Sequence, residues 1–344
     1  QNLYSTPWLT ERHGYDPTSV NPALAESLPL VGGAFAWANR NANVRMRSEQ
    51  LDRYAAQLDA PATAESSAGC RMTLSQAYFD GDWLRLSVLL TAEDDSLAGF
   101  DEIMPMRPEQ RADPNVWPDD REGYGDLVLA DGSLLGPEGS LAFTRQDEKT
   151  FVLQLNYPVF LQPDPAALAG QQLTLVLRDL VGYNLENLVT DYDEYGVGGA
   201  RWETANETDL PGVYTMTFTV PAPDEAGVRT AAGTDAATGI TVEELRATPA
   251  ATKLVVTVPN TPVGEIDPEH ITPLRNTEFR LRTADGRPLK PERAEGAPTD
   301  ETGAAYRYTA YFDAAPEDAD AIEVLVLQDG EEYASLTLPL TSAR

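Results

Sequence analysis

Apolar and polar residues alternate in short runs along most of this chain, and turn-forming residues separate the runs. In Arg71–Tyr78 and Trp83–Val88 the alternation lies on either side of Asp80-Gly81, a dipeptide typical of tight β-hairpin turns. The segments Ile240–Thr248 and Lys253–Val258 repeat this outline. The pattern predicts many short antiparallel strands rather than long helices.

The same series of segments occurs twice along the chain, in the same order. After the two hairpins, four further pairs correspond: Ala130–Leu135 with Ala284–Leu289, Phe151–Tyr157 with Tyr306–Phe312, Leu173–Leu177 with Ile322–Leu327, and Tyr214–Val220 with Tyr333–Leu338. Matches in a fixed order indicate a duplicated architecture. We therefore expect a mainly β fold of two tandem immunoglobulin-like β-sandwich domains.

Composition predicts where these domains begin and end. Residues 223–238 are rich in Ala, Gly, Thr and Asp and contain no aromatic residue, which is typical of a linker. The first sandwich is then expected at 61–222 and the second at 239–344. At the N-terminus, Ser48 is a candidate cap for a short helix that runs through Leu58. We expect residues 1–60 to form an arm and short helices that pack on the first domain.

The two copies differ in one connection. In the second copy a tight turn at Gln328–Glu331 joins the last two strands, whereas in the first copy the same connection contains an insertion at 179–212. Apolar residues at helical spacing predict a helix that begins after Asn184 and ends at Gly196: Leu185, Leu188, Val189 and Tyr192. A long insertion into a compact fold is often functional.

The insertion mixes aromatic side chains with carboxylates, and this mixture suits a glycan or a protein partner. The predicted contact residues are Tyr183, Asp191, Tyr192, Asp193, Glu194, Tyr195 and Trp202. The alternative is that these aromatic side chains pack back onto the sandwich. If the chain recognises a ligand, we expect the first copy to bind it and the second to act as a spacer.

The overall charge limits the possible partners. The chain has 55 acidic and 25 basic residues, a formal net charge of −30, so it repels nucleic acid and anionic lipid surfaces. Cys70 is the single cysteine, which excludes an intrachain disulfide. No apolar run is long enough to span a bilayer.

The sequence offers little for catalysis, and we expect no enzyme and no cofactor. His13 and His270 are the only histidines, and Cys70 has no histidine near it in sequence. Gly196-Val197-Gly198-Gly199 lacks the Gly-Lys-Ser/Thr ending of a phosphate loop and predicts a flexible turn. A hydrolase that uses paired carboxylates is a third possibility, after binding and adhesion, because only the tertiary structure shows which acids are close.

Calcium is the one metal that the residue types favour. Asp191, Asp193 and Glu194 lie almost in a row, and Asp119, Asp120 and Glu122 form a second acidic group. Hard oxygen ligands suit Ca²⁺, although the EF-hand pattern is absent. The alternative is a solvated acidic surface, which the net charge makes common.

Four segments of the first part of the chain form a recognisable series: Asn21-Pro22-Ala23, Leu28–Phe35, Tyr54-Ala55 and the hairpin Thr73–Ser87. Through them, residues 21–95 resemble the domain-of-unknown-function family four-one-seven-nine of Gram-positive bacteria. The second copy is similar to the β domain that often follows in these proteins.

In that family a short apolar segment lies outside a transmembrane helix and precedes the first hairpin. Many members resemble anti-sigma factors, and the family has no established catalytic residues. The resemblance implies an extracytoplasmic sensing or binding region of a single-pass membrane protein, with its anchor upstream of Gln1. A secreted carbohydrate-binding or adhesive module is the alternative.

Overall fold

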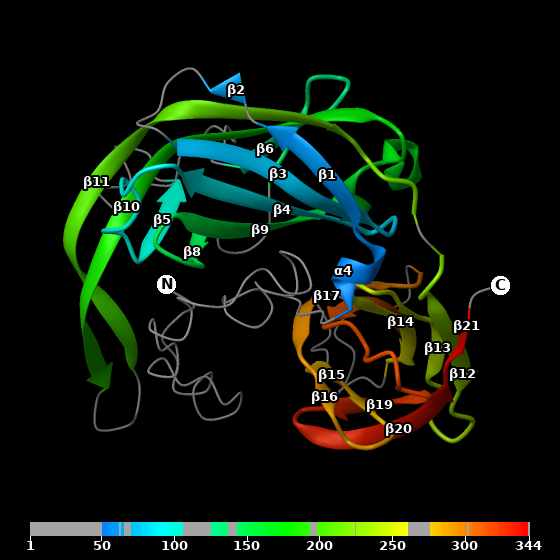
Figure 1. Ribbon diagram of the computed structural model, residues 1–344. Helices are drawn as coiled ribbons and strands as arrows, with labels where there is room; N and C mark the ends of the chain where they lie inside the picture. Colours follow the sequence, from blue (N-terminus) through cyan, green and yellow to red (C-terminus); the bar gives the residue numbers. More distant parts are fainter. Residues whose placement is uncertain are drawn as a thin grey trace, which may run out of the picture. The chain divides into compact units, whose positions relative to one another are not determined.

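The computed structural model describes residues 50–61, 63–64, 70–105, 125–136, 143–192, 198–223, 225–260, 276–300 and 303–342. The fold is mainly β, with antiparallel sheets and, among the described residues, one short α-helix, α4 (Leu51–Tyr54) (Figure 1). The chain divides into two compact units. Ala55–Ala222 belongs to the first unit, and Pro223–Arg344 belongs to the second together with the stretch that ends at Tyr54.

The first unit folds one long sheet back on itself to make two facing layers. The sheet order is β1 (Ala56–Pro61), β3 (Cys70–Phe79), β4 (Trp83–Ala92), β9 (Thr150–Pro158), β8 (Phe143–Arg145), β5 (Glu102–Pro105), β10 (Gln172–Tyr192), β11 (Gly198–Thr219) and β2 (Thr63–Ala64). In addition, β6 (Gly125–Val128) pairs with β10 and with β7 (Leu134–Leu135). Two short 3-10 helices, Val159–Leu161 and Pro165–Leu168, follow β9.

The apolar core of this unit lies between the two layers. Alternate residues of β4, such as Leu84 and Leu86, share one buried cluster with Leu175 of β10 and Met216 of β11. Alternation therefore places one face of each strand in the core, as the sequence pattern predicts.

The second unit has two separate sheets around its own core. One sheet has the order β17 (Pro291–Pro298), β18 (Ala305–Phe312), β14 (Thr252–Pro259), β13 (Thr241–Ala247), β12 (Arg229–Thr234) and β21 (Thr341–Ser342). The other has the order β16 (Pro288–Leu289), β15 (Thr277–Thr283), β19 (Ala321–Gln328) and β20 (Glu331–Pro339). Leu254 of the first sheet and Val324 of the second are both fully buried in the shared cluster.

The two units repeat the same ladder of strands. The order β1-β3-β4-β9-β8 in the first unit corresponds to β12-β13-β14-β18-β17 in the second, and β7-β6-β10-β11 corresponds to β16-β15-β19-β20. Even the irregularities agree, because β3 has a bulge between Leu74 and Gln76 and β13 has one between Val242 and Glu244. The duplication seen in the sequence is therefore a duplication of strand topology.

Equivalent turns use the same local chemistry. After β3, the Asp80 carboxylate accepts hydrogen bonds from the N–H groups of Asp82 (3.0 Å) and Trp83 (2.7 Å). After β13, the Thr248 hydroxyl accepts hydrogen bonds from the N–H groups of Ala250 and Ala251, both at 3.1 Å. A short polar side chain thus closes each hairpin through the backbone two and three residues ahead.

Two expectations about segment boundaries need correction. The stretch predicted to be a linker, 223–238, contains β12, which pairs with β13 and β21 and so belongs to the second sandwich. The helix predicted through Leu58 ends at Tyr54, because the next residues form β1 and pair with β3 from Ala56 to Pro61. In both cases a non-local strand partner overrides a weak local pattern.

The helix α4 belongs to the second unit rather than to the first. Leu51 is fully buried, and Gln50 Nε2 donates a hydrogen bond to the carbonyl of Ala315 at 3.1 Å. Arg53 pairs with Glu317 at 2.6 Å, and the Tyr54 hydroxyl donates to the same carboxylate at 3.1 Å. These contacts fix the segment to the connection between β18 and β19.

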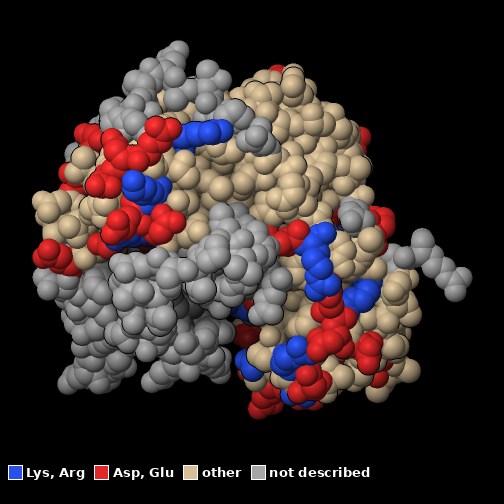
Figure 2. All heavy atoms as spheres, in the orientation of Figure 1, with Lys and Arg blue, Asp and Glu red and all other residues tan. Residues whose placement is uncertain are grey.

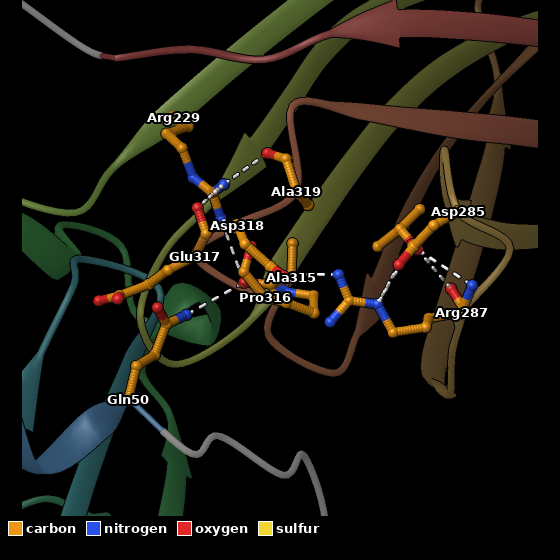
Figure 3. Close-up of polar contacts among 10 residues, drawn as sticks. Gln50, Arg229, Asp285, Arg287, Ala315, Pro316, Glu317, Asp318 and Ala319 are labelled. Atoms are coloured by element: carbon orange, nitrogen blue, oxygen red, sulfur yellow. Dashed lines mark hydrogen bonds and ion pairs between the residues drawn. The ribbon is translucent and has the colours of Figure 1, made fainter.

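Arg229 of β12 holds that connection from the other side (Figure 3). Its guanidinium donates to four backbone carbonyls: Ala315 at 3.1 Å, Pro316 at 2.9 Å, Glu317 at 3.0 Å and Ala319 at 2.8 Å. Partial burial lowers the pKa of Arg229, and the nearby Glu317 carboxylate opposes that shift. The planar guanidinium suits this geometry because its donors have fixed directions.

Candidate functional site

The insertion of the first copy is a long β-hairpin and not a helix. Strands β10 and β11 continue to pair from Asn184↔Asn206 to Tyr192↔Gly198. We call residues 184–206 the arm. In Figure 1 the arm runs on past β5 and β8 as a twisted two-stranded ribbon. The apolar residues at helical spacing are strand residues here, because each has a cross-strand partner that local spacing cannot reveal.

The predicted contact residues separate into three groups. Tyr183 lies at the base of the arm and is only 5% exposed. The backbones of Asp191, Tyr192 and Trp202 lie in the paired strands of the arm. Asp193, Glu194 and Tyr195 lie outside the described residues. The structure therefore places one predicted residue at the base and three along the strands.

Asp101 fixes the base of the arm through both its backbone and its side chain. Its N–H donates to the Tyr183 carbonyl at 2.8 Å, and its carboxylate accepts from the N–H of Leu185 at 2.9 Å. Arg145 lies 4.0 Å from the same carboxylate. The Asp101 side chain thus takes the place of a strand carbonyl at the point where β5 stops pairing with β10.

Close packing also determines the path of the chain at the base. Gly182 lies under the ring of Phe100, and a Cβ atom at this position would be 2.5 Å from Phe100 Cδ1. An isolated glycine within an apolar strand pattern indicates a close approach of this kind. Gly182 was therefore a signal in the sequence for the base of the arm, and it is absent from the predicted contact residues.

The base is acidic and partly desolvated. Burial raises the pKa of the Glu102 carboxyl, and the neighbouring Asp101 carboxylate raises it further. Glu186, Glu207 and Asp209 are exposed on the same ribbon. Figure 2 shows Asp and Glu side chains over the side of the first unit where β5, β10 and β11 lie. The arm is thus a negatively charged extension on a fixed base.

A second unusual feature lies on the face of β3, β4 and β9 that points away from the core. This outer face is buried but polar: Gln76, Tyr78, Arg85, Ser87, Gln154 and Asn156. Ser87 and Gln154 lie opposite each other. Among the residues that the structure describes, the Ser87 hydroxyl and both amide atoms of Gln154 have no hydrogen-bond partner.

The equivalent face of the second unit, on β13, β14 and β18, has different residues. Val255 and Thr309 are the equivalent cross-strand pair. Beside them, Lys253 and Glu244 are half-buried and lie 3.8 Å apart as an ion pair. A buried polar group without a partner costs about 1–3 kcal/mol. The first copy therefore has Ser87 and Gln154 at a position where the second copy has Val255 and Thr309.

Most of the remaining candidates from the sequence lie outside the described residues. His13, His270 and the acidic group at Asp119 to Glu122 lie outside the described residues. Burial raises the pKa of the Cys70 thiol, and its sulfur lies 3.9 Å from the Ser96 hydroxyl, which is an environment that disfavours the reactive thiolate.

The described ranges contain neither a metal-binding group of side chains nor a membrane-spanning helix. In those ranges, no three His, Cys, Asp or Glu side chains are grouped so that they could hold a metal ion. No helix there is long and apolar enough to cross a membrane.

No protein-family model and no curated protein matches this sequence. Solved structures do match, and one of them is the crystal structure of the conserved domain protein from Bacillus anthracis. That chain is 14% identical, the match covers 92% of this chain and 100% of the other, and the TM-score is 0.43. This distant likeness does not bear on what the present chain binds.

Proposed function

We propose that this chain is a non-catalytic binding region in which the arm of the first unit is the recognition element. One observation carries the proposal: the same strand topology is built twice, and only the first copy extends the hairpin that the second closes at once. In the second unit β19 and β20 are joined by Asp329 and Gly330, both with positive φ. The core thus needs no arm, and extra structure of this kind is often functional.

The chain's place in the cell is part of the same proposal. We assign it to the extracytoplasmic side of a bacterial single-pass membrane protein related to anti-sigma regulators. The resemblance of residues 21–95 to the family described above supports this assignment. The strong negative charge also supports it, because this charge disfavours binding to nucleic acid.

Shortening the arm tests its role directly. Residues 185–205 are replaced by Asp-Gly, so that Asn184 and Asn206 close as Gln328 and Glu331 do. Aspartate followed by glycine fits this two-residue turn. In a host with the full-length gene, we expect the variant to fold and to lose the response of the associated sigma factor, measured with a transcriptional reporter.

A matched control and a topology experiment complete the test. Asp329→Asn alters the equivalent turn of the second unit without changing its length, and the reporter response should stay normal. If the short-arm protein is stable and the response is unchanged, the arm is not the recognition element. Reporter fusions upstream of Gln1 map the membrane topology, and a chain without a membrane anchor there contradicts the regulator assignment.

A further inference from the structure

We propose that the arm binds an extended, basic segment of a partner polypeptide by adding it as a strand to the edge of β10. This inference rests on the proposed function, since it assigns a partner class to the same arm. The argument uses the pairing of β10, the chemistry of its edge and the charge of the arm.

The pairing of β10 changes along its length. Thr174–Leu177 pair with β6, and Leu180–Tyr183 pair with β5. Beyond Tyr183, the only described strand that pairs with β10 is β11. Among the described residues, the Asp101 carboxylate makes the contact on the β5 side that follows, where it accepts from Leu185 N–H at 2.9 Å. The edge of β10 that follows is the natural place for another strand.

The arm lacks two of the features that usually protect a strand edge. Residues 184–206 contain no proline and no lysine, both of which commonly block edge pairing. Its bulges, at Asn184/Leu185 and Glu186/Leu188, lie near the base. Farther out, Leu188–Tyr192 pair regularly with Trp202–Gly198. A regular edge of this kind accepts a peptide strand through main-chain hydrogen bonds.

Charge decides which strand fits. The arm contains five acidic residues against one basic residue, Arg201, so its net charge is −4. A second copy of this chain, paired edge to edge, would place two such arms together and is disfavoured by repulsion. A basic segment gains attraction and faster association. The partner class is therefore an extended polypeptide with lysine or arginine along one face.

The fixed base favours binding because it reduces the cost of ordering the arm. The Asp101 hydrogen bonds and the contact between Phe100 and Gly182 set the direction in which the ribbon leaves the sandwich. A pre-organised edge pays less conformational entropy when a partner strand adds.

Capped synthetic peptides test the inference on the whole chain. The probe is a short peptide of alternating lysine and valine, compared with one of alternating glutamate and valine, and with the lysine peptide N-methylated at every residue, which blocks both of its edges. Titration calorimetry gives the affinity, and amide exchange by NMR maps the site. We expect the lysine peptide to bind, the glutamate peptide not to bind, and N-methylation to weaken binding at least about tenfold.

Two variants connect the binding to the arm. Replacement of residues 185–205 by Asp-Gly should abolish binding of the lysine peptide. Asp191→Lys combined with Glu203→Lys keeps the arm but raises its net charge from −4 to 0, and should abolish the preference for the lysine peptide over the glutamate peptide. Slower exchange of the β10 amides in the arm on binding supports strand addition.

Each contrary outcome has a separate meaning. Equal binding of the N-methylated peptide overturns strand addition, because charge alone then explains the affinity. Binding on a glycan array that Trp202→Ala abolishes identifies a carbohydrate occupant and also overturns the inference. If no peptide binds but the reporter response still depends on the arm, the inference fails and the proposed function stands. If the lysine peptide binds but the response ignores the arm, the proposed function fails instead.

Discussion

Exchange of one cross-strand pair between the two copies should stabilise the first unit. The change is Ser87→Val with Gln154→Thr, which installs the pair that the second copy has at Val255 and Thr309. The exchange replaces three buried polar atoms that have no partner among the described residues, Ser87 Oγ, Gln154 Nε2 and Gln154 Oε1, by one, the hydroxyl of the new threonine.

The expected size follows from the cost of these atoms. An unsatisfied buried polar group costs about 1–3 kcal/mol. Imperfect packing of the new valine destabilises the unit by about 1–3 kcal/mol. The exchange leaves two fewer such atoms, and their cost outweighs one packing cost, so we expect a net gain of about 1–3 kcal/mol. In a unit of this size, each kcal/mol raises the melting temperature by about 2–4 °C.

Scanning calorimetry of the whole chain measures this effect. Val255→Ser in the second unit is the mirror control, because it buries a hydroxyl in place of an apolar group that is 2% exposed. That change should lower the free energy of unfolding of the second unit by about 1–3 kcal/mol. If the exchange instead destabilises the first unit, its polar atoms have partners in solution, such as ordered water, and the reasoning is wrong.

Three further changes test other parts of the structure. Gly182→Ala should destabilise the first unit by about 1–3 kcal/mol through its clash with Phe100, and Phe100→Leu should recover part of that loss in urea titrations. The pKa of Glu102 is raised in the folded state, so the protonated carboxyl contributes fully to stability below its unfolded pKa of about 4.3, and this contribution is lost as the pH rises through the pKa of the folded state. Glu102→Gln should remove this pH dependence of the stability. A stability–pH curve that Glu102→Gln leaves unchanged would contradict the assigned burial. Arg229→Lys should lower the free energy of unfolding of the second unit alone, by about 2–4 kcal/mol, because lysine cannot reach four carbonyls at once. A calorimetric shift confined to the transition of the first unit would disprove the contacts of Arg229 with these carbonyls.

The β class, the hairpins and the duplication could be predicted because each depends on neighbours in sequence. Alternation marks the two faces of a strand, and Asp80 closes its turn with its own carboxylate. The order of the matched segments then gave the common topology. In each case the decisive contacts lie within a few residues.

The candidate site was predicted only in outline. The position of the insertion followed from comparing the two copies, but Leu185–Tyr192 fits both a helix and a strand when taken alone. Pairing with residues 198–204, across the whole hairpin, makes it a strand. The role of Asp101 at the base was invisible, because Leu185 lies 84 positions away in sequence.

By itself, the sequence determined the repeated core strands, the tight turns between them, that the unit occurs twice and that the chain is acidic. Only the tertiary structure decided that β12 joins the second sandwich, that α4 packs there too, that the insertion is a ribbon, and that the polar outer face of β3, β4 and β9 is buried. The physical reason is the distance along the sequence between the residues that interact. Side-chain periodicity and turn chemistry act between near neighbours, whereas strand partners and burial depend on residues brought together by the fold.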